Sequence, residues 1–167
     1  MQQVWQSQIK WDQQLPTELI ITYLDWRRKL EALKNTQIPR FCLSKEQSDK
    51  VTLHVFCDAS EKGYAACIYV VAEDTEGVKT SKLLFAKSRV APLKVQSIPR
   101  LELCGALLGQ RLLSSVLQAL TKMKLVVTET FAWTDSTIVL SWMKQEPNKW
   151  TTFVANRMAE IQHDQDL

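Results

Sequence analysis

The stretch Arg100 to Leu120 constrains the fold more than any other, because it is helical in pattern and apolar on nearly every side. Pro99 suits the first turn of a helix, and no helix-breaking residue follows before Thr121. The apolar side chains are Leu101, Leu103, Cys104, Leu107, Leu108, Leu112, Leu113, Val116, Leu117 and Leu120. A helix that is apolar all round is buried in a protein core. We therefore predict a core helix over these residues, packed on a β-sheet.

One face of this predicted helix has almost no side chains. Glu102 lies in its first turn, and the residues three, four and seven positions later are Gly105, Ala106 and Gly109. Residues at these spacings share a face of a helix. Because glycine costs about 1 kcal/mol inside a helix, two glycines on one face indicate that another backbone approaches closely. This would place the Glu102 carboxylate against the end of a strand.

Three apolar runs before the helix predict an antiparallel meander. The stretch Val51 to Ser60 alternates apolar residues on one face, and we expect this strand to end at Asp58. Two more runs, Gly63 to Val71 and Lys82 to Val90, follow after short connections. Short connections between strands are typical of antiparallel neighbours.

A fourth strand repeats the pattern of the first, with an apolar run followed by an acid and a small hydroxyl residue. It covers Thr130 to Trp133, with residues 125–128 as a candidate beginning, and leads to Asp135. Ser136 is a suitable N-cap for a helix. Two helices are predicted after it, Thr137 to Gln145 and Trp150 to Gln162, followed by a polar tail from His163 to Leu167.

Residues 1–44 form a predicted helical arm in front of a domain at residues 45–167. Pro16 stands where a helix should begin, and apolar residues follow at helical spacing. They are Leu19, Ile20, Tyr23, Leu24, Trp26, Leu30 and Leu33. Between arm and domain, Gln37 to Leu43 is predicted to be extended and Ser44 to Lys50 to be a polar loop.

Composition excludes several classes of protein. The 167 residues suffice for one domain with an arm, and a formal charge of +3 does not indicate a dedicated nucleic-acid binder. The four cysteines have no CxxC spacing, which argues against zinc and favours reduced cysteines in an intracellular protein, cytoplasmic or nuclear. We expect no signal peptide, because polar residues follow Met1, and no membrane-spanning helix, because no uncharged apolar run is long enough.

Three carboxylates stand in matched positions. Asp58 and Asp135 end two strands, and Glu102 begins the helix between them. If the two strands are parallel neighbours, the three acids meet at one end of the sheet. Their mutual repulsion would be relieved by Mg²⁺ or Mn²⁺, which prefer oxygen ligands. Two such ions about 4 Å apart can activate water and stabilise the leaving oxygen of a phosphodiester. Each acid alone could equally be a helix cap or a turn residue.

Several motifs in the same order resemble the ribonuclease H region of Bel/Pao-type LTR retrotransposon polyproteins. They are FCDAS, SRVAPLKVQSIPRLELCGALL, FAWTDSTIVLSWM and KWTTFVANRMAEIQ, and they extend from Val51 to Gln162. The earlier segment WDQQLPTEL…IPRFC resembles the connection between reverse transcriptase and ribonuclease H in those elements.

This resemblance implies an α/β fold with a ribonuclease H-like mixed sheet, in which three antiparallel strands are followed by a parallel one and helices cover both faces. The metal-binding and catalytic acids of the family correspond to Asp58, Glu102 and Asp135. The implied reaction is hydrolysis of the RNA strand in an RNA–DNA hybrid, recognised by backbone shape and 2′-OH groups. A reverse transcriptase domain, or another protein, is a partner implied for residues 1–44.

The chain departs from the family pattern at its C-terminal end. Family members continue into a fifth strand and a segment of NPADLA type, which supplies a fourth acid. No such segment is present here, and the surroundings of Asp164 and Asp166 do not resemble it. We therefore expect the last strand and helix to be missing, the second metal site to be weakened, and one sheet edge to be open to a partner.

Two other functions are compatible with the residues alone. The first is a host-retained, inactive remnant of a retroelement that binds protein or nucleic acid. The second is an aspartic peptidase, because two Asp residues followed by small residues could share a proton. Neither Asp58-Ala59-Ser60 nor Asp135-Ser136-Thr137 has the glycine of the peptidase motif, and the long core helix does not suit an all-β enzyme.

Basic residues before and at the start of the core helix are candidate contacts to a phosphate backbone. They are Lys87, Arg89, Lys94 and Arg100. The alternative is that they form a solvated face with no ligand.

Overall fold

The computed structural model describes residues 2–37, 50–74 and 76–163. The chain divides into two compact units, Met1–Arg40 and Phe41–Leu167. The predicted extended segment Gln37 to Leu43 and the predicted loop Ser44 to Lys50 lie almost wholly outside the described residues, as does the tail after His163.

The first unit is helical and has little core of its own. Its elements are α1 (Gln2–Gln6), α2 (Thr17–Leu30) and the 3₁₀ helix η1 (Glu31–Asn35). Pro16 is the N-cap of α2, as expected from the fixed φ of proline. No residue of α2 or η1 is buried, and Trp26 is 55% exposed. The apolar stripe of α2 therefore faces solvent within this unit.

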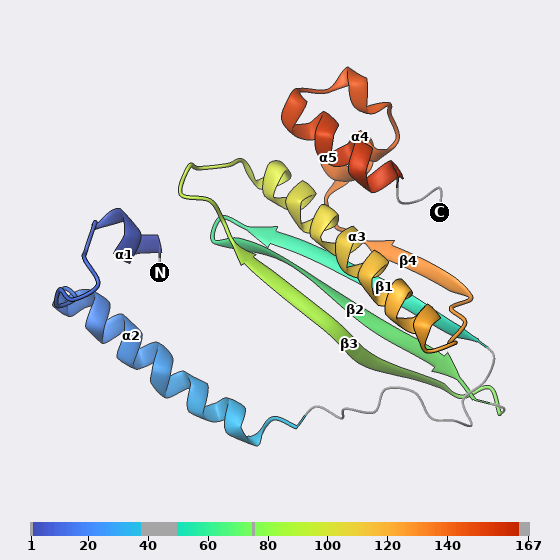
Figure 1. The fold of residues 1–167 in the computed structure, drawn as a ribbon, viewed down its shortest axis with the longest axis horizontal. Helices are drawn as coiled ribbons and strands as arrows, with labels where there is room; N and C mark the ends of the chain where they lie inside the picture. The colour runs from blue at the N-terminus through green and yellow to red at the C-terminus, as the bar shows by residue number, and fades with distance from the viewer. Residues whose placement is uncertain (1, 38–49, 75, 164–167) are drawn as a thin grey trace. The chain divides into compact units, whose positions relative to one another are not determined.

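The second unit is built on a four-stranded mixed sheet in the order β3-β2-β1-β4 (Figure 1). Its strands are β1 (Val51–Ser60), β2 (Gly63–Glu73), β3 (Lys79–Val90) and β4 (Glu129–Trp133). β1 pairs antiparallel with β2, and β2 pairs antiparallel with β3. The predicted meander is thus confirmed, and β3 and β4 are the edge strands of the described sheet.

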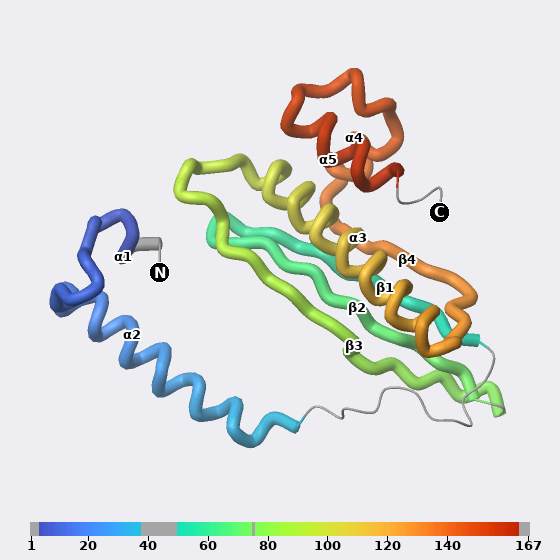
Figure 2. The backbone as a smooth tube through the Cα atoms, in the orientation of Figure 1, coloured from blue at the N-terminus to red at the C-terminus, as the bar shows by residue number. Residues whose placement is uncertain are grey.

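The parallel pair β1–β4 brings two distant parts of the chain together. Val55 lies opposite Ala132, and Phe56 lies opposite Trp133. Figure 2 shows the crossover between them, in which the chain passes from β3 through the long helix α3 (Ile98–Lys122) before entering β4. A parallel neighbour requires such a crossover. The carboxyl ends of β1 and β4 consequently lie side by side.

Helix α3 is apolar on nearly every side because it packs against two layers. Toward the sheet, Leu108, Leu112 and Leu113 share a buried cluster with Val55 and Ile68. Toward the C-terminal helices, a second cluster holds Leu103, Ala106, Leu107, Val139, Val154, Met158 and Ile161. Each fully buried leucine contributes roughly 1.5–3 kcal/mol through removal of apolar surface from water.

The second layer consists of α4 (Thr137–Met143), the 3₁₀ helix η2 (Pro147–Lys149) and α5 (Thr152–His163). By length and composition α3 is apolar enough to cross a membrane. Its burial between the sheet and α4/α5 is the pattern of a core helix instead.

The glycine face of α3 lies directly on the sheet, which confirms the predicted close approach. A Cβ atom on Gly105 would stand 3.2 Å from the carbonyl oxygen of Asp58. A Cβ on Gly109 would stand 3.0 Å from a methyl carbon of Val55. Only residues without side chains let the helix come this close to β1, so these glycines set the distance between Glu102 and the end of the strand.

The opposite face of the sheet carries exposed aromatic rings. Phe56 is 43% exposed, Phe131 is 38% exposed and Trp133 is 49% exposed. The rings of Phe56 and Trp133 stack with centroids 6.2 Å apart. The resemblance implied helices on both faces of the sheet, but α3, α4 and α5 form layers on one side of it (Figure 1).

Several element boundaries differ from the predicted ones. β1 does not end at Asp58 but continues to Ser60, because Ala59 and Ser60 still pair with Tyr64 and Gly63. Residues 125–128 do not belong to β4, which begins at Glu129. β2 is two residues longer at its end, β3 is three residues longer at its start, and α3 is two residues longer at each end. α4 is two residues shorter at its end, and α5 begins two residues later and ends one residue later. Frayed ends and pairing across strands, which local pattern does not encode, account for such differences.

The close contact at Gly105 can be tested by substitution. Gly105→Val should lower the free energy of unfolding by about 1–3 kcal/mol, because the added methyl groups meet backbone atoms of β1 that cannot move aside. Denaturant unfolding measures this change. Gln118→Val is the matched control, since Gln118 is exposed on the same helix. An equal loss in the two variants would mean that the packing at Gly105 is not tight.

Candidate functional site

Asp58 is placed by the alternation of β1. Val55 and Cys57 face α3, so Asp58 projects from the other side of the strand, near its carboxyl end. It lies opposite Ala65 of β2 and is exposed. One carboxylate oxygen, Oδ1, accepts a hydrogen bond of 2.7 Å from the Ala59 amide. Small neighbours leave room around this acid.

Asp135 is placed by the short connection between β4 and α4. The Ser136 hydroxyl accepts a hydrogen bond of 3.2 Å from the Val139 amide, so it caps α4 as predicted. The Thr134 hydroxyl accepts a hydrogen bond of 3.2 Å from the Ser136 amide. Asp135 is thus held between two residues whose hydroxyls fix the backbone, while its own side chain remains exposed.

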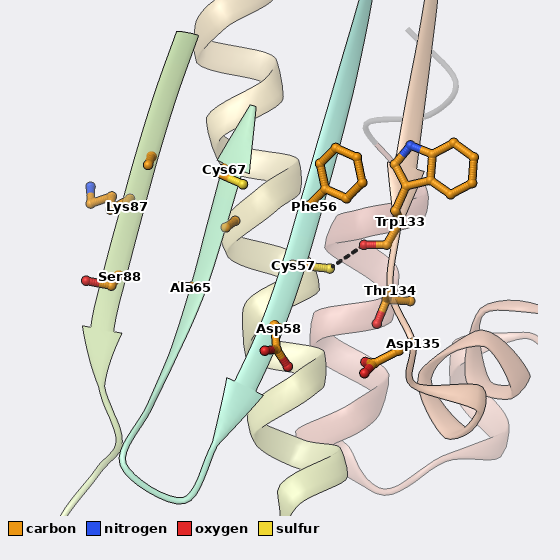
Figure 3. Close-up of a pocket in the computed structure, with 12 residues that line it drawn as sticks. Phe56, Cys57, Asp58, Ala65, Cys67, Lys87, Ser88, Trp133, Thr134 and Asp135 are labelled. Atoms are coloured by element: carbon orange, nitrogen blue, oxygen red, sulfur yellow. Dashed lines mark hydrogen bonds between the residues drawn. The ribbon is translucent and has the colours of Figure 1, made fainter. Parts of the chain in front are cut away.

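Asp58 and Asp135 line one open cavity of about 630 Å³, which we call the acid pocket. Figure 3 shows the two carboxylates beside each other, Asp58 near the carboxyl end of β1 and Asp135 in the connection after β4. The pocket is also lined by Phe56, Cys57, Lys87 and Trp133. The parallel pairing of β1 and β4 therefore does bring the two strand-end acids together.

Glu102 meets the residue next to Asp135. The Ser136 hydroxyl donates a hydrogen bond of 2.6 Å to Oε2 of Glu102, and this carboxylate is half-buried. The bond ties the first turns of α3 to the start of α4. Glu102 is not among the residues that line the acid pocket. Glu102 consequently lies beside the connection that carries Asp135, and its carboxylate faces Ser136.

The donor chemistry of this region fits a hard divalent cation in part. Asp58 and Asp135 offer carboxylate oxygens at one pocket, which suits Mg²⁺ or Mn²⁺. Within residues 2–37, 50–74 and 76–163, however, no three Asp, Glu, His or Cys side chains gather closely enough to hold a metal ion. The two strand-end acids fit as ligands, and Glu102 would have to turn away from Ser136 to join them.

The pKa of the Cys57 thiol depends in part on the charges of the acid pocket. Burial raises the pKa of its thiol, and a hydrogen bond with Thr134 partly offsets that effect. The negative charges of Asp135 and Asp58 raise the pKa further, because they disfavour a thiolate. Both carboxylates therefore act on one thiol at the junction of β1 and β4.

The predicted phosphate-contacting residues do not form one surface. Lys87 lines the acid pocket, whereas Arg89 lines a second pocket beside α3 and α5. The guanidinium of Arg100 lies over the Phe153 ring, 4.9 Å from its centroid. Lys94 is exposed in the loop after β3. Of these four cations, Lys87 is the one that shares a pocket with the acids.

Some contacts of the site are not readable in the sequence. Ser136 was predicted as a cap, but its bond to Glu102 joins residues 34 positions apart. His54 accepts a hydrogen bond of 3.2 Å from the Trp133 indole and stacks on Phe131, which supports a structural role. Arg111 and Glu160, 49 positions apart, form a bidentate ion pair. An arginine inside an otherwise apolar helix was the available signal for that pair.

A comparison with protein families decides the identity of the domain. The family model described as "Pao retrotransposon-like RNaseH-like domain" matches residues 1–136. The chain belongs to this family. The match includes the helical arm as well as β1 to β4 and α3, so it contains Asp58, Glu102 and Asp135.

The solved structures to which this chain is similar at low sequence identity include three described as ribonuclease H or nuclease proteins. The N-terminal ribonuclease H domain of a Mycobacterium tuberculosis protein is 16% identical, with 71% of this chain and 76% of that chain covered and a TM-score of 0.38. A ribonuclease H1 isolated from compost is also 16% identical, with 71% and 77% covered and a TM-score of 0.41. The NurA nuclease of Sulfolobus solfataricus is 11% identical, with 90% and 55% covered and a TM-score of 0.37. No curated protein sequence matches the chain.

Ser136, which follows Asp135 and bonds Glu102, should be important for the stability of the domain. Ser136→Ala removes both the cap of α4 and the partner of Glu102, so the free energy of unfolding should fall by about 1–2 kcal/mol. Thermal or denaturant unfolding measures the loss. Ser141→Ala, at an exposed position of the same helix, should change stability little. Equal stability of the Ser136→Ala variant and the unmodified chain would contradict the two hydrogen bonds.

The charge on the two strand-end acids should be detectable at Cys57. In Asp58→Asn and Asp135→Asn the pKa of the Cys57 thiol should fall, since each variant removes a negative charge that disfavours the thiolate. A lower pKa raises the thiolate fraction at any pH below the pKa, so alkylation should be faster in both variants. Peptide-resolved alkylation against pH measures the change, and Glu61→Gln is a control acid in the nearby turn. An unchanged alkylation profile would place the carboxylates too far from the thiol to act on it.

Proposed function

We propose that this RNaseH-like domain hydrolyses the RNA strand of an RNA–DNA hybrid with the help of Mg²⁺ or Mn²⁺. The observation that carries the proposal is the acid pocket, which is lined both by Asp58 from β1 and by Asp135 from the connection after β4. Membership of the family and its nuclease-like topology support the same reading. The mixed sheet with its 25-residue core helix does not suit the all-β architecture of an aspartic peptidase.

Each residue of the pocket has a distinct role in this proposal. Asp58 and Asp135 would hold the divalent cation, and Glu102 would complete the ligand set after releasing Ser136. The bound cation supplies Lewis acidity for attack on a phosphodiester. Lys87 lines the same pocket, and its positive charge would pair with a phosphate of the bound strand. The exposed rings of Phe56 and Trp133 form the apolar wall of the pocket.

We also propose a cellular setting for the domain. We place the domain within a retrotransposon-derived polyprotein in which it acts during reverse transcription, in the reducing interior of a cell. The described cysteines Cys57, Cys67 and Cys104 are free thiols, which is compatible with such a compartment. The exposed apolar stripe of α2 would contact a neighbouring reverse transcriptase domain, because it is unburied within its own unit.

A second candidate function is a non-catalytic binding module. The bond between Ser136 and Glu102 favours it, because a carboxylate engaged with a hydroxyl is not turned toward a cation. In this case the domain retains the fold and the hybrid-binding surface but has lost the metal-dependent step. The nuclease requires Glu102 as a metal ligand for cleavage, whereas the binding module requires it only for the stability of the fold.

Cleavage of a labelled RNA–DNA hybrid in Mn²⁺ or Mg²⁺ tests the proposed reaction. Asp58→Asn, Asp135→Asn and Glu102→Gln should each lower the rate roughly 100-fold, because each removes charge that would hold the cation. Glu61→Gln removes an exposed acid from the nearby turn and should leave the rate unchanged.

Two further results separate the candidates. A Mn²⁺-dependent rise in melting temperature that disappears in Asp58→Asn would support metal binding without reference to activity. A folded chain that binds the hybrid but neither cleaves it nor responds to Mn²⁺ would reject the nuclease and favour the binding module.

A further inference from the structure

A second pocket lies on the helix side of the sheet, and its charge is not used by the proposed reaction. It has a volume of about 240 Å³ and is formed by the start of β2, the end of β3, the middle of α3 and α5. The polar side chains that line it are Tyr64, Arg89, Arg111, Asn156, Arg157 and Glu160. We call it the arginine pocket.

Positive charge is in excess in the arginine pocket. Three of its lining side chains are arginines, and among the described residues that line it Glu160 has the one carboxylate. Arg111 donates two hydrogen bonds to that carboxylate, one from Nε to Oε1 and one of 2.8 Å from Nη2 to Oε2. The pair keeps the pKa of Arg111 raised, chiefly through the hydrogen bond to Glu160. Two guanidinium charges are left without a carboxylate in the pocket.

Arg157 is held in place by an aromatic residue rather than by an acid. Its guanidinium carbon lies 3.6 Å from the centroid of the Phe153 ring, and Nη1 donates a hydrogen bond of 2.9 Å to the Phe153 carbonyl. No carboxylate of the described residues forms an ion pair with it. Stacking orients the flat guanidinium but does not neutralise its charge.

Arg89 is the cation on the strand side of the site. It is an exposed residue near the end of the edge strand β3, opposite Tyr64 in β2. Its guanidinium forms no hydrogen bond or ion pair with another described residue. An anion in the pocket could therefore be met by Arg89 from the strand side and by Arg157 and Arg111 from the helices.

We propose that the arginine pocket binds a phosphate group of a nucleic-acid backbone. Guanidinium groups recognise phosphate oxygens in pairs of parallel hydrogen bonds, and Tyr64 and Asn156 can add neutral donors. The inference rests on the proposed function and extends it to a second contact with the hybrid. Such a contact fixes the position of the strand without reading its sequence.

The position of the pocket relative to the acids favours a strand of the hybrid over a free anion. Tyr64 and Arg89 are the immediate neighbours of Ala65 and Ser88, which line the acid pocket from the same two strands. Neighbouring residues of a strand point to opposite faces. The two pockets therefore flank the same end of the sheet, and a nucleic acid that passes this end can contact both.

The salt dependence of hybrid binding tests the proposal without any need for cleavage. Fluorescence anisotropy in EDTA, over about 50–200 mM NaCl, gives the affinity and its slope against salt. Arg89→Ala should weaken binding roughly three- to tenfold, independently of base sequence, and should reduce the magnitude of the slope by about one. Lys122→Ala is the matched control, because it removes one exposed charge at the other end of α3 from Glu102.

A variant with the opposite effect sharpens the test. Glu160→Gln removes the carboxylate of the pocket and should strengthen binding of the hybrid and steepen its salt dependence. Circular dichroism establishes that each variant is folded. If Glu160→Gln fails to fold, Arg89→Ala and Arg89→Lys are compared with the unmodified chain to test the phosphate contact. Because lysine keeps the positive charge, Arg89→Lys should restore most of the dependence of hybrid affinity on salt.

Inorganic phosphate separates the two sources of the anion. At constant ionic strength, phosphate in place of chloride should raise the melting temperature slightly in the unmodified chain and not in Arg89→Ala. A phosphate effect without hybrid binding would overturn the assignment to a nucleic-acid backbone. Equal hybrid affinity and slope in Arg89→Ala and Lys122→Ala would overturn the site itself, whereas loss of cleavage in Asp58→Asn would still support the proposed nuclease.

Discussion

The contact between the glycine face of α3 and the end of β1 determines how the rest of the domain is arranged. Because Gly105 has no side chain, the helix rests on the backbone of Asp58 itself. The short separation between α3 and β1 places the first turns of α3 beside the carboxyl ends of β1 and β4. The helix can then cover the sheet on one side and α4 and α5 on the other, which is why apolar residues surround it.

The same arrangement concentrates charge at one end of the sheet. Asp58 and Asp135 share a pocket, and Glu102 is bound to the serine that follows Asp135. The pKa of Cys57 is raised chiefly by burial, and the negative charges of Asp135 and Asp58 add to that effect. On the helix side of the same sheet end, the arginines carry the opposite charge. A polyanion with bound cations would complement both surfaces, since cations would offset the acids and arginines would pair with phosphates.

The sequence predicted most of the elements and their order because the signals are local. The alternation of Val51 to Ser60, the apolar run of α3 and the capping serine before α4 each depend on residues a few positions apart. The strand ends were predicted less well, since pairing of Ala59 and Ser60 with β2 extends β1 beyond the acid. The parallel pairing of β1 with β4 was predicted as a condition for the acids to meet, and it is present.

The sequence by itself determined which acids stand near strand and helix ends, because polar residues that follow apolar runs mark those regions, although β1 continues two residues beyond Asp58. It also determined the close helix–sheet contact, because glycines at helical spacing serve few other purposes. The tertiary structure decided that the Glu102 carboxylate meets Ser136 and that Arg89, Arg111 and Arg157 line one pocket. Such contacts join residues from different elements, so they depend on how helices and strands pack, which no local pattern of residues encodes.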